Sequence, residues 1–479
     1  MKEAHAYITM EGCRNIKIKG CEFTGGMSGI LFAENEADYH ANYDISIIDN
    51  TMTNIVRGIV QPNYGWGTSL LRQPSIIDSD ICNNKISIQN YNPRTNWIYA
   101  GCYYNNGNER SLFNSTGISI SGFQLRITDN IIGGGSKLVD ETPDGTYWTG
   151  LVENLSVAGY GSNAEGFQVN PDGGLELYNT NSKNLIIPTC KDGISLCVEG
   201  GGRRGRYDAD MQYPAAIGPL DMSYGNMNET LDFTPKGSPA QCCSFDISRN
   251  QIISWRTGVH IDFKTGSIGT KLNSNQPKID HNNIQCMRRP IQVRCGYQQQ
   301  RTIDCMSIGW NKLSMYHQSD IFKKVPNTKW MDAEGKNTWL VYGMGDACIQ
   351  INQVAEDDQG VHTDNRFSHL YIKWNDINAS TYTYRTYGIR LTGIHNQYWM
   401  DSHRWIGNAV RGGYYSMVCN PSTDHSTRSN WNSFYDNSLS HNYYSTWLAG
   451  AWGGSASTYA YYRNYSHTTY TGGTADGTQ

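Results

Sequence analysis

A repeated asparagine is the sequence feature that most limits how this chain folds. Each instance follows a short stretch of alternating apolar residues, and an apolar residue comes two positions later, as in SIIDNTM around Asn50. The ten instances are Asn50, Asn84, Asn130, Asn184, Asn250, Asn282, Asn311, Asn375, Asn408 and Asn437. The short intervals between them are 34, 32, 29, 33 and 29 residues. A period in this range is typical of solenoids, so the chain is predicted to complete one coil per repeat, with the longer intervals arising from doubled coils or insertions.

A small or rigid residue opens a second strand in several repeats. Gly258 lies eight residues after Asn250, and Pro290 holds the same place after Asn282. The strands that open in this way carry apolar pairs in equivalent places: Ile30 and Phe32, Ile194 and Leu196, Val259 and Ile261, Ile291 and Val293, and Ile389 and Leu391. Because the side chains of a strand alternate between its faces, these pairs are predicted to fill one interior and their neighbours to point outward.

Composition favours strands and turns over helices. The 479 residues include 50 Gly, 32 Tyr and 13 Trp, only 17% are charged, and amphipathic helical stretches are essentially missing. We therefore predict an all-β fold, a right-handed parallel β-helix, because parallel crossovers are almost always right-handed. The solenoid is predicted to span residues 1–450, with long loop insertions at about 89–117, 133–150, 199–243 and 323–347. Residues 451–479 are predicted to form an aromatic-rich cap or subunit contact and a polar tail.

Charge and hydropathy argue against several classes of partner. The formal net charge is −4 and the pI is near 6.3, which gives no general attraction for nucleic acid. No stretch approaches the run of about 20 apolar residues that a membrane-spanning helix needs, and the first residues are not followed by the apolar segment of a signal peptide. The thirteen cysteines show no metal-binding spacing, so Cys286, Cys295 and Cys348 are expected to be buried free thiols.

Over roughly residues 12–450, the chain alternates apolar and polar residues in short strands that are bounded by Asn and Gly. This pattern resembles the right-handed β-helix superfamily of phage tailspike depolymerases, pectate lyases and related glycoside hydrolases. The resemblance is architectural, and no catalytic signature aligns residue by residue. It implies a homotrimeric virion spike that cleaves a bacterial surface polysaccharide, either capsule or O-antigen, with acidic residues and without a cofactor. It also implies synthesis in the host cytoplasm and a virion tail or baseplate protein as the partner at the N-terminal end.

Asp262 is the first candidate for the chemistry. It is predicted to face outward, on the same face as His260 and next to Arg294 of the following coil. Hydrolysis of a glycosidic bond needs two carboxylates on opposite sides of that bond, and Asp262 would supply one of them. The alternative is a surface ion pair between Asp262 and Arg294, which contributes about 0–1 kcal/mol and has no catalytic role.

A second acidic group follows the predicted strand that begins at Cys348. Glu356, Asp357 and Asp358 are consecutive and precede a His and an Asp a few positions on. Three carboxylates in a loop are candidates for a catalytic acid, or for binding Ca²⁺. A solvated turn with no function is the alternative reading.

A third group combines acids with tryptophans in the 323–347 insertion. Asp332 and Glu334 lie beside Trp330 and Trp339. Exposed aromatic rings beside polar groups suit the flat C–H faces of sugars, so these residues are predicted to bind substrate. The same aromatic surface is equally compatible with contacts between subunits.

Three functions remain open on the sequence. The leading hypothesis is a tailspike-like depolymerase that hydrolyses a bacterial surface polysaccharide with paired carboxylates. A polysaccharide lyase on the same scaffold would instead use His260 and Arg294 to remove a proton beside a uronate carboxylate. A non-catalytic receptor-binding or structural fibre would bind glycan without cleaving it.

Overall fold

The computed structural model describes residues 6–32, 42–61, 75–88, 116–137, 186–188, 190, 192–198, 245–254, 257–263, 277–286, 289–296, 302–304, 306–315, 347–354, 366–368, 370–379, 387–393, 399–401, 404–413, 415–420, 428–430, 432–442, 444–448, 459–462 and 465–468. Within these ranges the regular structure consists of strands and contains no helix. The part of the chain that is described therefore contains no helix that is long and apolar enough to cross a membrane.

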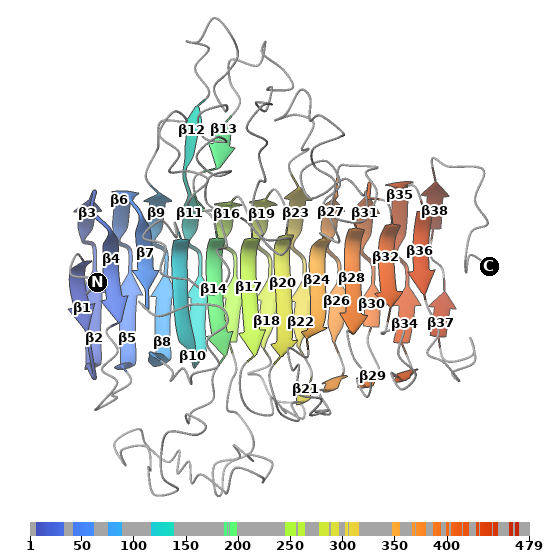
Figure 1. Ribbon diagram of the computed structural model, residues 1–479, viewed down its shortest axis with the longest axis horizontal. Helices are drawn as coiled ribbons and strands as arrows, with labels where there is room; N and C mark the ends of the chain where they lie inside the picture. Colours follow the sequence, from blue (N-terminus) through green and yellow to red (C-terminus); the bar gives the residue numbers. More distant parts are fainter. Residues whose placement is uncertain are drawn as a thin grey trace, which may run out of the picture.

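Three parallel ladders of strands run along the long axis of the molecule (Figure 1). The first ladder contains β1 (Ala6–Met10), β4 (Ser28–Phe32), β7 (Arg57–Val60), β10 (Thr116–Thr128), β14 (Asp192–Val198), β17 (Thr257–Phe263), β20 (Arg289–Gly296), β24 (Ala347–Val354), β28 (Tyr387–Gly393), β32 (Tyr415–Asn420) and β36 (Tyr444–Leu448). The second contains β2 (Arg14–Lys19), β5 (Asn42–Ile48), β8 (Ile76–Cys82), the end of β10, β15 (Phe245–Ser248), β18 (Lys278–Asp280), β22 (Ser307–Gly309), β26 (Tyr371–Lys373), β30 (Arg404–Ile406), β34 (Asn432–Tyr435) and β37 (Tyr459–Tyr462). The third contains β3 (Glu22–Thr24), β6 (Thr51–Ile55), β9 (Lys85–Ile88), β11 (Ile131–Gly133), β16 (Gln251–Ser254), β19 (Asn283–Cys286), β23 (Lys312–Met315), β27 (Asp376–Asn378), β31 (Ala409–Arg411), β35 (Ser438–Asn442) and β38 (Tyr465–Thr468).

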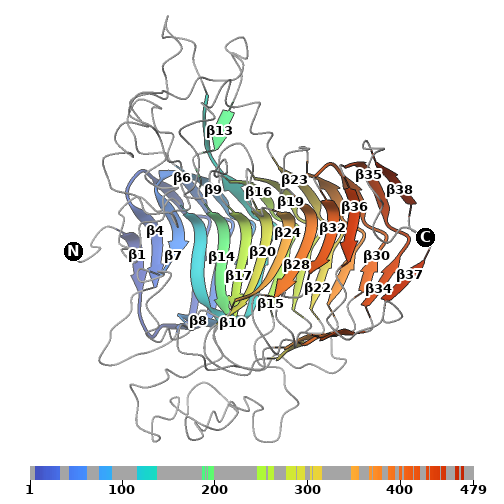
Figure 2. The same ribbon diagram turned by 45° about the vertical axis from the view of Figure 1, so that its right-hand side comes forward.

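The chain visits the first, second and third ladder in turn and then repeats the circuit, so the described strands make eleven coils of a parallel β-helix. In Figures 1 and 2 the first ladder lies in front, the second lies behind it, and the third runs along the upper edge. Strand β10 joins the first two ladders, because its beginning pairs with β7 and β14 and its end with β8 and β15. The predicted stacking of parallel strands is confirmed.

Smaller sheets lie outside the three ladders. Strands β21 (Thr302–Asp304), β25 (Arg366–Ser368), β29 (Trp399–Asp401) and β33 (Arg428–Asn430) form a fourth parallel ladder, and β12 (Gly135–Lys137) pairs antiparallel with β13 (Ile186–Pro188). The predicted insertions lie almost entirely outside the described residues. In the C-terminal segment, β37 pairs with β34 and β38 pairs with β35, which continues the second and third ladders.

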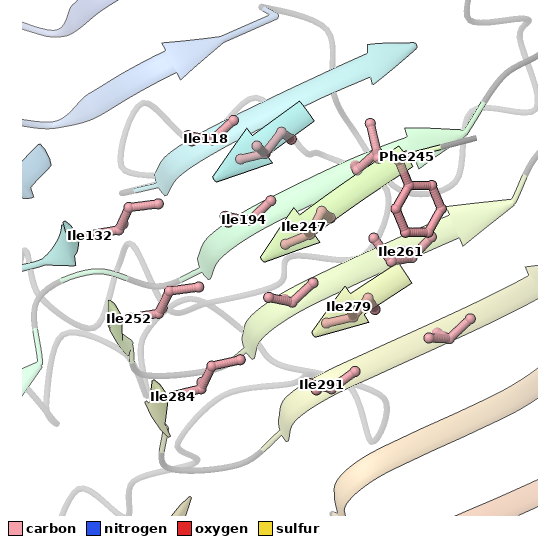
Figure 3. Close-up of a cluster of buried hydrophobic side chains, with 14 of the residues drawn as sticks. Ile118, Ile132, Ile194, Phe245, Ile247, Ile252, Ile261, Ile279, Ile284 and Ile291 are labelled. Atoms are coloured by element: carbon pink, nitrogen blue, oxygen red, sulfur yellow. The ribbon is translucent and has the colours of Figure 1, made fainter. Parts of the chain in front are cut away.

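One apolar interior runs through the stack, as predicted. Val259, Ile291 and Ile389 of the first ladder are fully buried and belong to a single cluster. Figure 3 shows how isoleucines of all three ladders, such as Ile279 and Ile284, point into this interior. Burying each such side chain contributes about 1.5–3 kcal/mol, so the stack is stabilised mainly by its repeated interior positions.

Gly258 illustrates why a glycine opens strands of the first ladder. A Cβ atom at this position would lie 2.2 Å from Cγ2 of Ile284 and 2.5 Å from the carbonyl oxygen of Pro290. The isoleucine comes from the third ladder and fills the space where a larger residue would place its side chain. The glycine is therefore required by close packing between two ladders.

The repeated asparagines form a continuous buried column at the turn between the second and third ladders. In the middle of this Asn column, Oδ1 of Asn282 accepts hydrogen bonds from N and Nδ2 of Asn250, each at 3.0 Å. Nδ2 of Asn282 donates to the carbonyl oxygen of Ile247 at 2.9 Å and to Oδ1 of Asn311 at 3.0 Å. Each amide thus satisfies backbone groups at the bend and links neighbouring coils.

Nine of the ten predicted asparagines belong to the Asn column, and the prediction for Asn184 is wrong. Nδ2 of Asn130 donates directly to Oδ1 of Asn250 at 3.0 Å, which leaves no place for an asparagine between them. Asn184 itself lies outside the described residues. Asn311 likewise bonds directly to Asn375, 64 residues later. The long intervals are therefore single coils with insertions, and the alternative of doubled coils is excluded.

The cysteines whose side chains the structure describes are free thiols. Cys190, Cys286 and Cys348 are buried, whereas Cys13, Cys21 and Cys82 are half-buried. Burial raises the pKa of the Cys348 thiol well above its usual range. The prediction of buried thiols is confirmed for Cys286 and Cys348, while the description at Cys295 extends to the backbone only.

Candidate functional site

His260 lies on the outer face of the first ladder but is buried. Its neighbours Val259 and Ile261 fill the interior, so strand alternation places the imidazole on the opposite face. The side chain is only 2% exposed. Its Nδ1 lies 3.3 Å from Oε1 of Gln292, and the tautomer with a proton on Nδ1 donates a hydrogen bond there. Nη1 of Arg289 donates to the same Gln292 oxygen at 3.4 Å.

His260 and Gln292 belong to a polar column that follows the register of the first ladder. The column consists of Ser119, Ser195, His260, Gln292 and Gln350, each paired with the next across neighbouring strands. All five side chains are buried. Since burying polar groups is costly unless they are hydrogen-bonded, the bonds of Gln292 to His260 and Arg289 stabilise this buried layer outside the apolar core.

Asp262 and Arg294 are register partners on neighbouring strands β17 and β20, as the repeat predicted. Adjacent strands lie about 4.8 Å apart, so the two backbones are close enough for side chains to meet. On its other side Asp262 pairs with Cys197. The partner carboxylate needed for hydrolysis must therefore come from outside these two neighbouring positions.

The remaining predicted site residues lie outside the described part of the chain. They are Glu356, Asp357, Asp358, Trp330, Trp339, Asp332 and Glu334. Strand β24 ends at Val354, two residues before Glu356, and its Asn352 pairs with Arg294. The described strand thus ends just before the acidic run. Among the described side chains, no group of three His, Cys, Asp or Glu is arranged to hold a metal ion.

A second cluster, which the sequence reading missed, lies where the second ladder meets the third. The residue just before each asparagine of the column has a positive φ, and three consecutive coils carry His281, Trp310 and Trp374 there, with φ of 58°, 52° and 56°. We call these three residues the corner ridge. Trp310 is 43% exposed and Trp374 is 51% exposed. The motifs SIGWNKL and YIKWNDI carry the signal, because tryptophan is unusual in a left-handed turn.

The rings of the corner ridge are held by their neighbours. The His281 and Trp310 rings stack, with centroids 5.2 Å apart and planes 12° apart. Nζ of Lys373 lies 4.6 Å from the centroid of Trp310. The Trp374 ring lies against Gly407, where an added Cβ atom would come within 2.3 Å of Cε3. Each tryptophan therefore has a defined position although part of its surface is exposed.

Asp280 lies beside this ridge, at the end of β18. Its Oδ1 accepts hydrogen bonds from the Gly309 backbone N at 2.8 Å and from Oγ of Ser307 at 3.3 Å. The residue is only 9% exposed, and this burial raises the pKa of its carboxyl despite those bonds and the nearby Lys373. The carboxyl occupies the space left by the missing side chain of Gly309, which is a structural role.

Two surfaces thus combine described geometry with chemistry that could act on a ligand. The first ladder holds the buried His260 and Gln292 and the register partners Asp262 and Arg294, and the corner ridge presents partly exposed aromatic rings. The first was predicted from the sequence and the second was not. Comparison of the chain with protein-family models, with curated protein sequences and with solved structures gave no match.

Proposed function

We propose that the protein binds and cleaves a bacterial surface polysaccharide, as the β-helical tailspike depolymerases it resembles do. The observation that carries the proposal is the register of the first ladder, which pairs Asp262 with Arg294 on neighbouring coils, beside the polar column. Polar groups recur there at about 4.8 Å along the long axis. Because the side chains of this column are buried, a linear polymer laid along the ladder would contact the residues beside the column, with Asp262 and Arg294 on consecutive coils.

Hydrolysis with paired carboxylates is the leading mechanism. Asp262 supplies one carboxylate, and the run from Glu356 to Asp358, which follows β24, supplies the other. A separation of about 5–5.5 Å between the carboxyl groups would retain the anomeric configuration, and about 6.5–9.5 Å would invert it. In either case one carboxyl group protonates the leaving oxygen while the other acts as nucleophile or base.

Elimination is the second candidate mechanism, supported by His260, Arg289 and Arg294 on neighbouring strands; because His260 is only 2% exposed, the mechanism requires a substrate to open this buried layer. His260 shares Gln292 with Arg289, and the backbone of Arg294 lies in register with that of Asp262. In a lyase, an imidazole would remove the proton beside a uronate carboxylate, and arginines would neutralise that carboxylate. The product would then be an unsaturated sugar that absorbs ultraviolet light.

The proposed setting is a phage virion. We infer a right-handed β-helix that forms a homotrimer, is made in the host cytoplasm and is attached to a tail or baseplate protein through its N-terminal end. This assembly is supported by the stacked parallel coils and by the resemblance to tailspikes. A non-catalytic fibre with the same shaft is the alternative from a different functional class.

Purified protein incubated with a panel of capsular and O-antigen polysaccharides tests the proposal. We expect one polymer to be shortened on a sizing column, and the Asp262→Asn or Asp357→Asn variant to lose this activity. Asp129→Asn is the matched control, because Asp129 is an exposed acid that pairs with Arg249 on another part of the surface. Ultraviolet absorbance of the products distinguishes elimination from hydrolysis.

Three outcomes would count against the proposal. Intact polymer across a broad panel that includes the natural host's glycan would overturn the depolymerase, and saturable binding without cleavage would favour the fibre. Full activity of the Asp262→Asn variant would show that the reaction does not take place on the first ladder.

A further inference from the structure

The corner ridge exposes apolar surface that the fold does not require. Trp310 and Trp374 are among the few large hydrophobic side chains that are exposed in the described residues, and they lie on adjacent coils. The same corner position is occupied by Asp129, Arg249 and Gly407 in other coils. Packing therefore does not demand an aromatic residue there, and adjacent exposed tryptophans form an open apolar patch.

The ridge is rigid enough to act as a preformed surface. Each tryptophan is followed directly by an asparagine of the buried column, Asn311 or Asn375, which fixes the backbone on which it stands. Stacking on His281 fixes one ring, and close packing on Gly407 fixes the other. A ligand that binds these rings does not have to order them first, which reduces the entropic cost of binding.

The charges around the ridge are mainly positive, although the whole chain is negative. Lys373 lies over the Trp310 ring, and the guanidinium of Arg404 lies 5.6 Å from the Tyr371 ring. Lys312 is exposed on the following strand and forms no ion pair with a described residue.

The acids near the ridge are largely neutralised. Asp376 pairs with Arg411 at 2.6 Å, Asp246 pairs with Lys278 at 2.9 Å, and Asp280 is buried. The surface that a ligand meets at this corner therefore combines aromatic rings with an excess of positive charge.

We propose that the corner ridge is a binding site for an acidic polysaccharide, one whose sugar rings carry carboxylates. The C–H faces of the sugars pack on Trp310 and Trp374, and the carboxylates bind Lys373, Arg404 and Lys312. The site goes beyond the proposed catalytic function, since this is the one corner of the stack that does not border the first ladder. It would hold a polymer whether or not the first ladder cleaves it.

Affinity electrophoresis in gels containing polygalacturonate, alginate or hyaluronate tests this site. Methyl-esterified polygalacturonate is the matched neutral probe, because it keeps the backbone and removes the charge. We expect at least one acidic polymer to retard the full-length protein, with weaker retardation in higher salt and none by the methyl ester. The double variant Trp310→Ala with Trp374→Ala should bind about tenfold more weakly or worse, and Lys373→Gln should reduce the salt dependence.

The control is the double variant Ile131→Ala with Ile253→Ala, which removes exposed apolar side chains that are 45% and 40% exposed on the third ladder. This variant should keep full binding, and thermal unfolding should show that both double variants fold. Failure of every acidic polymer to retard the protein, or unchanged retardation of the tryptophan double variant, would overturn the site. Cleavage assays on the same variants report separately on the first ladder, so failure of one proposal is distinguishable from failure of the other.

Discussion

Asn282→Ala removes one side chain from the middle of the Asn column and tests whether that column stabilises the stack. Asn282 is buried, and its side chain takes part in four hydrogen bonds. Two of them join it to Asn250, one to Asn311 and one to the carbonyl oxygen of Ile247. The alanine makes none of these bonds, and it leaves polar groups of all three neighbours in a place that water does not reach.

The expected magnitude follows from these four bonds. A buried hydrogen bond contributes about 0.5–1.5 kcal/mol net, so the loss is about 2–6 kcal/mol, and unsatisfied partners place it toward the upper end. Domains of ordinary size are stable by about 5–15 kcal/mol, so one substitution would remove a large part of the margin. The effect should extend to neighbouring coils, because nearest-neighbour contacts stabilise a solenoid.

Denaturant unfolding followed by circular dichroism measures this loss. The matched control is Asn283→Ala, since Asn283 is the next residue, has the same side chain and is exposed on β19. The control should change the free energy of unfolding by less than about 0.5 kcal/mol. If Asn282→Ala also changed it by less than about 1 kcal/mol, the amide bonds of the column would not be stabilising, and the reasoning would be refuted.

Three further changes test other parts of the fold. The backbone N of Cys21 donates to Oδ1 of Asn50 at 2.9 Å, so the side-chain amide of a Cys21→Asn variant can donate to the same oxygen and extend the Asn column. This variant should raise the free energy of unfolding by about 0.5–1.5 kcal/mol in the same assay. An unchanged or lower value would contradict this. Gly258→Ala should destabilise by about 1–3 kcal/mol or more, because its Cβ would overlap Ile284, and a neutral result would show that the two ladders can separate. Because the pKa of Asp280 is raised in the folded state, protonation of its carboxyl stabilises the fold at low pH, and this stabilisation is lost as pH rises through that pKa. Asparagine does not titrate. The melting temperature of the Asp280→Asn variant, compared with that of the natural chain at the same pH, should therefore rise from acid toward neutral pH. A constant difference across that pH range would show that Asp280 does not titrate differently on unfolding.

The sequence predicts the repeating part of this fold well, because each coil must satisfy the same two demands. The turn requires an amide that bonds to the coils on both sides, which Asn250 and Asn282 provide. The interior requires apolar residues at alternate positions, which Val259 and Ile261 provide. Both demands recur at every coil, so they leave a periodic trace that can be read without a structure.

Interval length, by contrast, does not reveal what lies between two coils. The entropic cost of a longer loop rises only slowly with its length, so an insertion of any size can separate two neighbouring asparagines of the column. Asn184 matches the local pattern, yet Asn130 bonds directly to Asn250. Local pattern alone cannot distinguish a true member of the column from a similar stretch within an insertion.

The candidate site can likewise be predicted from the sequence only in part. The relation of Asp262 to Arg294 follows from the period, and the register places them opposite each other. The burial of His260 does not follow from it, because alternation tells which face a side chain occupies and not what lies above that face. The acids after β24 have no period, so the repeat predicts no register partner for them.

The corner ridge was not predicted, because the repeat is defined by the asparagine and not by the residue before it; the backbone at that preceding position nevertheless limits which residues are favourable there. A left-handed backbone costs an ordinary L-residue about 1–2 kcal/mol, a cost that Gly407 avoids and that Asp129 reduces. Trp310 and Trp374 incur this cost and also expose apolar rings to water. Stacking on His281 and packing on Gly407 offset the two costs in part, and a ligand that covers the rings would offset more. Packing fixes the residues at interior positions but not those at the corners. Coils can therefore differ in their corner side chains, and these differences decide what each coil can bind.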